Sequence, residues 1–318
     1  MQAWHVNTAQ AAKGKWKGIL LTLGVPAEVL VDRHGPCPMC GGKDRFRWDN
    51  KEGQGTFICN SCGAGDGMRL AIGITGKPFA EVAKEIDAML GNLKPDGDKP
   101  KADLSEAQRL SALREVAAQT VRIQRGDLVD KYLTTRGLHE HTYFKTLRFA
   151  PKLRDGEGQV RPCMVATVQD PAGVNVTLHR TFLKPDGSAK ADMASPRKLM
   201  PGPLPKGSAV RLSDYTGGPL GIAEGIETAL SAIILYEMPV WAAINAHMLA
   251  NWTPPEGCTE VAIFGDNDPK FAGQASAYQL AHRLALAGID VTVHIPREAG
   301  RDWNDELMAS YKKKDKAA

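Results

Sequence analysis

The sequence LGIAEGIETA at residues 220–229 joins a short apolar strand to an acidic turn and the start of a helix. The same order returns in VAIFGDND at residues 261–268, and a third acidic cluster, DWND at residues 302–305, follows the apolar residues 291–295. Apolar strands that alternate with helical segments are typical of a parallel sheet with crossover helices. Carboxylates at the carboxyl ends of such strands meet in one crevice, where oxygen ligands can bind Mg²⁺ beside a phosphate substrate. The pattern therefore predicts a magnesium site for phosphoryl or nucleotidyl chemistry.

The expected catalytic carboxylates are Glu224, Asp266 and Asp268, with Asp302 and Asp305 as further Mg²⁺ ligands. Two metal ions can activate an attacking 3′-hydroxyl and stabilise the departing pyrophosphate, which requires several carboxylates. A lone Asp-x-Asp is common in surface turns, but three strand ends together favour the metal site. Glu224 is expected either to bind metal or to act as general base. Asp302 and Asp305 are expected either to complete the metal shell or to cap the final helix.

Two cysteine pairs, Cys37-Pro38-Met39-Cys40 and Cys59-Asn60-Ser61-Cys62, have the spacing of a four-thiolate zinc ribbon. Because four thiolates close a tetrahedral shell, this zinc is expected to be structural. A redox-active Cys-x-x-Cys needs only one of the two motifs and would leave the other unexplained. Two closely spaced cysteine pairs in a chain without an export signal also favour metal binding over disulfide bonds. His34 lies near in sequence, but four cysteines already complete the shell.

Cations and aromatic residues alternate between the two cysteine pairs, on a segment that reads as a β-hairpin. Such a mixture suits single-stranded nucleic acid, because cations follow the phosphates and rings stack on bases. The other interpretation is that Phe46, Trp48 and Phe57 form the small core of the ribbon. The residues expected to contact nucleic acid here are Lys43, Arg45, Arg47 and Trp48.

The bulk composition is that of a multidomain globular protein. The 318 residues allow two or three domains, and 43% hydrophobic and 24% charged residues are ordinary values. We find no apolar run of membrane-spanning length and no signal peptide, so the cytoplasm is the expected location and no membrane partner is expected. Residues 101–210 carry 18 basic and 11 acidic side chains, whereas residues 211–318 carry 9 and 14. This division suits a protein that holds a polyanion on one surface and metal ions on another.

The expected fold is multidomain, with α+β and α/β parts. The expected divisions are a zinc β-ribbon domain with flanking helices at residues 1–92, a linker at 93–103, a basic mixed α+β middle domain at 104–215, a Rossmann-like parallel sheet with crossover helices at 216–311, and a basic tail at 312–318. Helices are expected near residues 9–30, 78–90 and 105–133, and strands at 164–169 and 175–182.

Taken together, these motifs resemble the zinc-ribbon and Toprim primases of phages, plasmids and mobile elements, related to the primase part of the phage P4 alpha protein and distantly to DnaG. The resemblance rests on CPMCGGKDRFR at residues 37–47, on CNSCGAGDG at 59–67, and on EGIETA at 224–229 with the aspartates of 266–268. It implies a C-terminal Toprim domain in which Glu224, Asp266 and Asp268 carry the metal-dependent chemistry. It also implies that the middle domain binds template and nucleotide, through His179, Arg180, Arg197 and Lys198.

The leading hypothesis is a DNA primase that makes short RNA primers on single-stranded DNA from ribonucleoside triphosphates, with structural Zn²⁺ and catalytic Mg²⁺ or Mn²⁺. The P4-like proteins continue into a helicase, whereas this sequence ends soon after Trp303, so a separate replicative helicase is an expected partner. Two rivals remain: a RecR-like zinc and Toprim module that binds DNA without catalysis, and a Toprim nuclease. The sequence has no P-loop, no Gly-x-Ser-x-Gly elbow and no zinc-protease histidine pair. A topoisomerase is disfavoured because no long region is left for a tyrosine gate.

Overall fold

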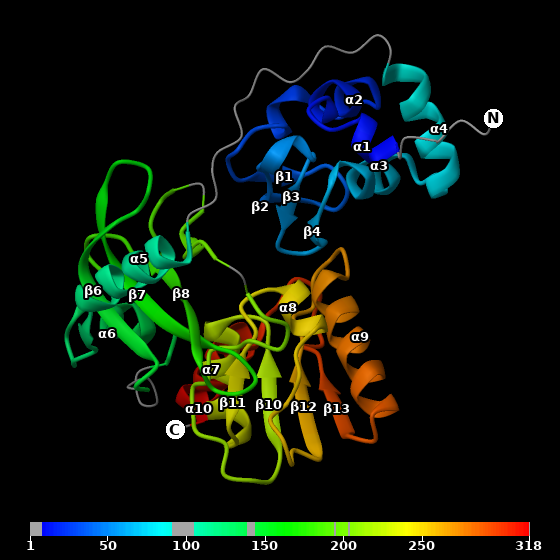
Figure 1. The fold of residues 1–318 in the computed structure, drawn as a ribbon. Coiled ribbons are helices and arrows are strands. Elements are labelled where there is room, and N and C mark those ends of the chain that lie inside the picture. The colour runs from blue at the N-terminus through cyan, green and yellow to red at the C-terminus, as the bar shows by residue number, and fades with distance from the viewer. Residues whose placement is uncertain (1–7, 91–104, 139–143, 194, 203, 318) are drawn as a thin grey trace. The chain divides into compact units, whose positions relative to one another are not determined.

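The computed structural model describes residues 8–90, 105–138, 144–193, 195–202 and 204–317. The chain divides into two compact units, Met1–Leu104 and Ser105–Ala318, which are drawn in Figure 1 and are treated separately below. The linker expected at residues 93–103 lies outside the described residues.

The first unit is built on an antiparallel sheet of four short strands in the order β1-β2-β3-β4. The strands are β1 (Gly35–Cys37), β2 (Gly41–Trp48), β3 (Phe57–Cys59) and β4 (Gly63–Gly65). Each cysteine pair spans a tight turn between two strands, with Cys37 opposite Gly41 in one turn and Cys59 opposite Gly63 in the other. Gly41 and Gly63 have positive φ, a conformation that glycine adopts at little steric cost.

Helices cover this sheet and complete its core. They are α1 (Thr8–Ala11), α2 (Trp16–Thr22), the short 3₁₀ helix η1 (Ala27–Val29), α3 (Gly67–Thr75) and α4 (Phe79–Leu90), with a second 3₁₀ turn, η2, at Lys51–Gly53. Within the helical stretch expected over residues 9–30, the stop and restart expected at Gly24 and Pro26 is found, and Gly14 adds a second interruption. Both glycines have positive φ. Trp16 of α2 is 2% exposed and belongs to the same apolar cluster as Phe46 and Phe57 of the sheet.

The second unit begins with an antiparallel five-stranded sheet in the order β5-β6-β7-β8-β9. Its elements are α5 (Glu106–Ala118), β5 (Val121–Arg122), α6 (Leu128–Thr134), β6 (Leu147–Arg154), β7 (Val160–Gln169), β8 (Asn175–Phe182) and β9 (Arg197–Leu199). Ser105 caps α5 in a capping box with Gln108, as its residue type led us to expect. The helical stretch expected to reach residue 133 instead ends at Ala118 and starts again at Asp127, whose side chain caps α6.

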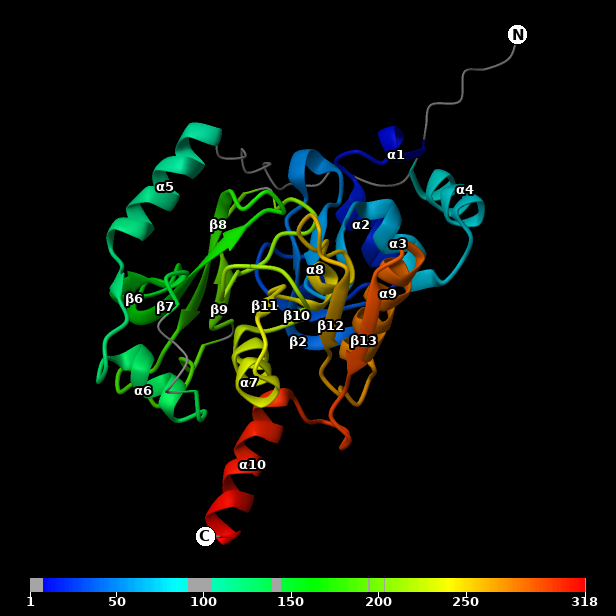
Figure 2. The same cartoon turned by 90° about the horizontal axis from the view of Figure 1, so that it is seen from below.

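The remainder of the second unit is a parallel sheet in the order β11-β10-β12-β13, flanked by helices on both faces (Figures 1 and 2). Its elements are β10 (Leu220–Ala223), α7 (Ile226–Tyr236), β11 (Val240–Ala242), α8 (Ala246–Ala250), β12 (Glu260–Phe264), α9 (Ala272–Leu286), β13 (Asp290–His294) and α10 (Trp303–Ala317). Helix α10 continues through residues 312–317, where we expected a tail.

The two faces of the parallel sheet belong to different apolar clusters. On one face α8 and α9 pack with Ile222 and Ile263. On the other face α7 and α10 pack with Phe264, and this cluster also contains residues of α6, β6 and β7. The antiparallel sheet and the parallel sheet therefore share one core. These observations confirm the expected fold class, a zinc-ribbon-like unit followed by mixed α+β and parallel α/β parts.

Among the described residues, no helix has the length and apolar character needed to cross a membrane.

We predict that Gly67→Ala destabilises the first unit. A Cβ at Gly67 would lie 2.1 Å from the Trp16 ring, and overpacking of this kind typically costs about 1–3 kcal/mol. Gly35→Ala is the matched control, because a Cβ there meets nothing within 4 Å. Chemical denaturation followed by tryptophan fluorescence should show a lower midpoint for Gly67→Ala alone, and equal midpoints for the two variants would contradict the packing described for Trp16.

Candidate active site and zinc centre

The four cysteines of the first unit converge on one point. Their sulfur atoms all lie within 4.8 Å of one another, and among the described residues this is the one group of His, Cys, Asp or Glu with such spacing. Cys37 Sγ and Cys62 Sγ are 4.0 Å apart, and Cys40 Sγ and Cys59 Sγ are 3.7 Å apart. Zinc–sulfur bonds of about 2.3 Å in a tetrahedron place sulfurs about 3.8 Å apart. The spacing therefore fits a structural Zn²⁺.

The electrostatics of the cluster also fit a bound cation. The backbone N–H groups of Ser61 and Cys62 donate to Cys59 Sγ, each over 3.4 Å. Burial, together with the neighbouring Cys40, raises the pKa of Cys62 to about 12, so a second thiolate is unfavourable here without a neutralising metal. His34 Nδ1 contacts the carbonyl oxygen of Asp44 at 2.9 Å and lies outside the group of four sulfurs.

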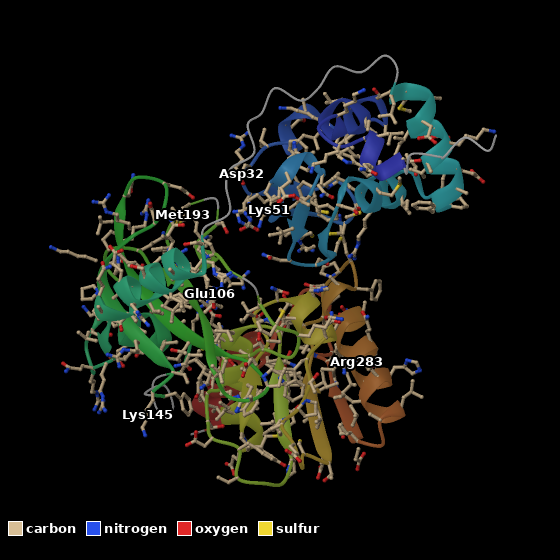
Figure 3. All side chains as sticks on the ribbon, viewed as in Figure 1. Asp32, Lys51, Glu106, Lys145, Met193 and Arg283 are labelled. Atoms are coloured by element: carbon tan, nitrogen blue, oxygen red, sulfur yellow. The ribbon has the colours of Figure 1, made fainter. Side chains whose placement is uncertain are left out.

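The aromatic residues of the ribbon form its core. Phe46 and Phe57 are each 1% exposed and stack with ring centroids 5.4 Å apart. Trp48 is 2% exposed, so the expectation that its ring contacts nucleic acid is wrong: the ring is covered by the protein itself. Lys43 is exposed, whereas Arg45 and Arg47 are half-buried. Arg47 Nε lies 3.3 Å from a carboxylate oxygen of Asp32, which Figure 3 labels.

The acidic residues of the second unit lie at the carboxyl edge of the parallel sheet, where the strand order reverses. Strand β10 has β11 on one side and β12 on the other, so the chain changes direction at β10. Glu224 follows β10 directly, and Asp266 follows β12 after Gly265. Ligands of open α/β sheets bind at this switch point, outside the carboxyl ends of the strands.

The pKa of Asp266 lies well above the ordinary value of an aspartate. It rises to about 8, first because the group is buried and then because Glu224, Asp302 and Asp268 place negative charge near it. Thr228 Oγ1 lies 3.4 Å from Asp266 Oδ1. The described carboxylates do not reach the 4.8 Å spacing of the cysteines, so a cation would have to draw their oxygens together. A hard divalent cation such as Mg²⁺ suits this set of oxygen donors.

Local contacts hold the Asp266–Asp268 loop in place. Asn267 Nδ2 donates to the Pro296 carbonyl over 2.8 Å, and the Asn267 N–H donates to the Arg301 carbonyl over 3.0 Å, which joins this loop to the one after β13. Asp268 Oδ2 accepts the N–H of Gly273 over 2.9 Å. A Cβ at Gly273 would lie 2.5 Å from the Asp266 carbonyl oxygen, so α9 can approach this closely only with glycine there.

Asp302 and Asp305 cap α10. Asp302 Oδ1 accepts the Asp305 N–H over 2.9 Å, and Asp305 Oδ2 accepts the Asp302 N–H over 3.2 Å, a reciprocal capping arrangement. Asp302 also contributes to the negative field at Asp266, so it is both a cap and a neighbour of the acidic cluster. The side chain of Asp305 is exposed.

The four predicted binding residues of the middle strands lie on two different faces of their sheet. His179 is 6% exposed and lies opposite Ala166, on the face that shares its core with the parallel sheet. Arg180 lies opposite Val165 on the α5 face, and its Nη2 donates to the Leu199 carbonyl over 3.3 Å.

The pairing of β8 with β9 divides the other two residues in the same way. Arg197 lies opposite Thr181 and Lys198 lies opposite Arg180. Lys198 Nζ is 2.7 Å from Glu157 Oε1. His179 and Arg197 therefore lie on the face toward the parallel sheet, and the four residues do not form one surface. Burial, followed by the charge of Arg197, lowers the pKa of His179 to about 3, so His179 is neutral at physiological pH.

Sequence reasoning missed a buried contact of Glu227. Tyr132 Oη donates to Glu227 Oε1 over 2.5 Å, and Lys190 Nζ lies 2.8 Å from the same oxygen. Glu227 is 7% exposed. Its partners are 95 and 37 positions away in sequence, so no local pattern announces them; a carboxylate within an otherwise apolar helix turn is the one available signal.

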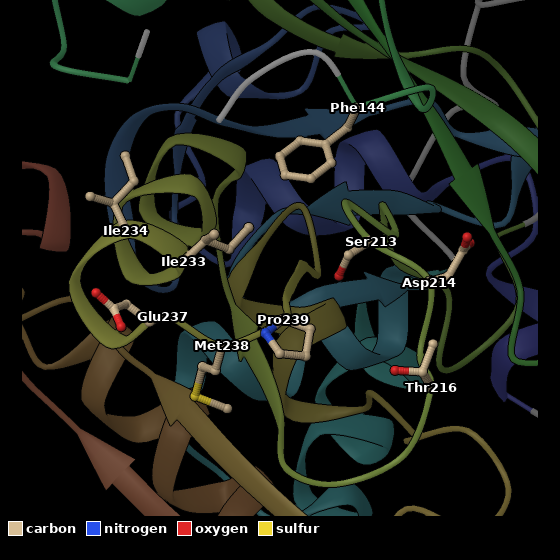
Figure 4. Close-up of a pocket in the computed structure, with 9 residues that line it drawn as sticks. All are labelled: Phe144, Ser213, Asp214, Thr216, Ile233, Ile234, Glu237, Met238 and Pro239. Atoms are coloured by element: carbon tan, nitrogen blue, oxygen red, sulfur yellow. The ribbon is translucent and has the colours of Figure 1, made fainter. Parts of the chain in front are cut away.

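A cavity of about 520 Å³ lies elsewhere in the second unit (Figure 4). It is lined by Ile233 and Ile234 of α7, by Pro239 just before β11, and by Ser213 and Thr216. This is the amino edge of the sheet, and none of the acidic site residues lines the cavity.

We predict that Cys59→Ser releases zinc and destabilises the first unit, because metal-binding free energy contributes to folding in a ribbon of this kind. Zinc quantified in the purified full-length chain should fall from a full equivalent to well below it. Cys258→Ser is the matched control, since Cys258 is buried in the second unit, outside the four-sulfur cluster. Full zinc retention by Cys59→Ser would refute the assignment.

We predict that Asp266→Asn removes a pH-dependent loss of stability. With a pKa near 8 in the folded state and 3.8 ordinarily, Asp266 keeps a proton that the unfolded chain releases, so its contribution to stability falls as pH rises from about 4 to 8. The melting temperature of the variant minus that of the wild type should increase across this window. Each kcal/mol of difference in the free energy of unfolding corresponds to about 2–4 °C in melting temperature. Excess Mg²⁺ should stabilise the wild type more than the variant. Asp290→Asn, exposed at the start of β13, is the control, and a flat difference across the window would contradict the raised pKa of Asp266.

Comparison with known families assigns the three parts of the chain. Residues 32–68 match the zinc-binding domain of primase-helicase, and residues 219–312 match the Toprim domain. Residues 107–212 match a domain of unknown function, DUF7146.

Solved structures that align with this chain include three primases, each 15% identical to it. The Aquifex aeolicus primase, with its zinc-binding and RNA polymerase domains, aligns over 99% of this chain and 85% of its own, with a TM-score of 0.42. The primase fragment of the bacteriophage T7 primase-helicase protein aligns over 88% and 96%, with a TM-score of 0.39. The RNA polymerase domain of Mycobacterium tuberculosis primase DnaG aligns over 66% and 82%, with a TM-score of 0.41. The two domain matches confirm the parts on which the resemblance was drawn: the chain combines a zinc-binding domain of the primase-helicase type with a Toprim domain.

Proposed function

We propose that this protein is a DNA primase, a nucleotidyltransferase that joins ribonucleotides into short RNA primers on a single-stranded DNA template. The observation that carries the proposal is the convergence of Glu224, Asp266, Asp268 and Asp302 at the switch point of the parallel sheet. A four-cysteine ribbon of the primase-helicase type in the same chain supports it. Binding of DNA alone would not require a half-buried set of mutually repelling carboxylates.

Each carboxylate has a role in this proposal. Asp266 and Asp268 are ligands of the catalytic Mg²⁺ or Mn²⁺, and Glu224 serves as a further ligand or as the general base. Two such ions would supply activation of the attacking 3′-hydroxyl and neutralisation of the departing pyrophosphate. Because the pKa of Asp266 is raised to about 8, a large part of its population is protonated at neutral pH, and this proton would have to leave before Asp266 could hold a cation. Asp302 adds negative charge beside this group, and Asp305 holds Asp302 in place through the cap of α10.

The basic residues contact nucleic acid and nucleotide in this proposal. The template phosphates are contacted by Lys43, Arg45 and Arg47 of the ribbon. The buried aromatic residues support the strand that carries these three cations. Arg197 lies on the sheet face toward the Toprim fold, so it is the cation of the middle strands best placed for a phosphate near the carboxylates. Single-stranded DNA and ribonucleoside triphosphates are the proposed ligands, and a separate replicative helicase is a proposed partner.

We predict that the full-length protein incorporates labelled ribonucleotides into short products on single-stranded DNA in the presence of Mg²⁺ or Mn²⁺. Asp266→Ala combined with Asp268→Ala should reduce product by at least about 10³-fold, because electrostatic stabilisation of a transition state is worth several kcal/mol. Asp290→Asn should synthesise primers as the wild type does. No product from any template, or full activity in the double variant, would refute the proposal.

The same samples separate the rival functions. Labelled single strands incubated with Mg²⁺ and without nucleotides would be shortened by a Toprim nuclease and left intact by a primase. A RecR-like module would bind these strands but yield neither cleavage nor synthesis.

A further inference from the structure

Glu227 makes a buried contact between two parts of the second unit. It lies in the first turn of α7, whereas Tyr132 belongs to α6 and Lys190 to the segment between β8 and β9. Both partners engage the same carboxylate oxygen, over 2.5 Å and 2.8 Å. Tyr132 is fully buried, and the Lys190 side chain is 25% exposed.

Glu227 stays ionised in this setting. Burial alone would raise its pKa, but Lys190, Arg197 and the hydrogen bond from Tyr132 together hold the pKa well below its usual range. A buried carboxylate that already has a cationic partner and a hydroxyl donor on one oxygen is poorly suited to release those partners for a metal ion. Glu227 is therefore separated in role from the carboxylates that repel one another around Asp266.

The place of Glu227 in the chain gives this contact its consequence. Glu224 and the N-cap residue Gly225 precede it by a few residues, so the orientation of the first turn of α7 sets the position of the Glu224 backbone. Thr228, the next residue, lies 3.4 Å from Asp266. The contacts of Glu227 with Tyr132 and Lys190 therefore restrain the chain on both sides of Glu227: the Glu224 backbone before it, and Thr228, which contacts Asp266, after it.

A second set of hydrogen bonds joins the same helix turn to the third acidic cluster. Ser231 Oγ donates to the Glu227 carbonyl over 2.9 Å, and Asn304 Nδ2 donates to Ser231 Oγ over 3.1 Å. Asn304 Nδ2 also donates over 2.8 Å to the carbonyl of Arg136, which lies two residues after the last residue of α6. Asn304 is 5% exposed and lies two residues after Asp302. Helices α6, α7 and α10 are thus joined by one buried polar network.

We propose that Glu227 is a positioning residue, which through its buried contacts with Tyr132 and Lys190 fixes the backbone that carries Glu224 beside Asp266. This inference rests on the proposed function, since it concerns the same carboxylates. It adds that the domain preceding the Toprim fold, through α6 and the segment before β9, sets the geometry of the metal site.

The test is the isosteric substitution Glu227→Gln in the full-length chain. The amide keeps the shape of the side chain but removes the charge that pairs with Lys190. Direct binding of Mn²⁺, measured by electron paramagnetic resonance at a temperature where the variant is folded, should weaken by about 10-fold or more, as loss of supporting contacts around a metal site typically does. The catalytic rate constant for primer synthesis should fall by about 10–100-fold with little change in the KM for nucleotide, because the reacting groups are misplaced.

Two further variants and a control keep this test decisive. Tyr132→Phe deletes one hydroxyl and should weaken Mn²⁺ binding by a smaller factor than Glu227→Gln does. Glu227→Asp keeps the negative charge and should recover part of the Mn²⁺ affinity that Glu227→Gln loses. Glu260→Gln, exposed at the start of β12, should bind Mn²⁺ as the wild type does. Wild-type Mn²⁺ affinity in Glu227→Gln, with or without a lower melting temperature, would overturn the proposal. If Glu227→Gln does not fold, wild-type affinity in Tyr132→Phe would overturn it.

The Mn²⁺ measurement also separates this inference from the proposed function. A wild type that makes no primer but binds Mn²⁺ in a Glu227-dependent way would refute the primase and retain the positioning role. A wild type that makes primers while Glu227→Gln binds and works normally would do the reverse.

Discussion

The parallel pairing of β10 with β12 is the constraint on which the candidate site depends. The register runs from Leu220 opposite Val261 to Ala223 opposite Phe264, so both strands end at the same level and deliver Glu224 and Asp266 to one edge. Close approach is built into the strands themselves: a Cβ at Gly221 would lie 2.6 Å from Val240 Cγ2, and one at Gly265 would lie 2.6 Å from Ile295. A shift of this register would separate the carboxylates, because each residue of strand spans about 3.3 Å.

The site concentrates negative charge that the fold must hold against its own repulsion. The raised pKa of Asp266 is the measure of that repulsion together with burial. Opposing it are contacts that leave the carboxylates little freedom, such as the Asn267 hydrogen bonds to Pro296 and Arg301 and the reciprocal cap of α10.

The sequence predicted those features that local patterns determine. Alternation of apolar strands and helices gave the parallel sheet, and strand β8 and the cap of α5 were found where expected, because period-2 alternation and capping are local. The cysteine spacing predicted a cluster that the sulfur distances fit. The orientation of His179 and Arg180 could not be predicted, since adjacent strand residues point to opposite faces and only the register with β7 decides which face meets the Toprim core. For Trp48 the hairpin pattern left two interpretations open, contact with nucleic acid or a place in the core of the ribbon, and its membership of the apolar cluster of the first unit favours the core.

Glu227 illustrates why the rest of the site lay beyond sequence reasoning. A glutamate in the first turn of a helix is ordinary, since it complements the helix dipole, and the apolar residues around it are the one sign in the sequence that it is buried. Its burial follows from the core that α6, β6 and β7 share with α7 and α10. This core surrounds the hydrogen bond to Glu227 from Tyr132, which is 95 positions away in the sequence. Within such a core an unpaired carboxylate would be strongly destabilising, whereas one paired with Lys190 and Tyr132 is tolerated and fixes a single arrangement of the helices around it. The apolar core and the polar network therefore depend on each other: the core excludes water from the contacts, and the contacts select the helix orientation that brings Glu224 to Asp266.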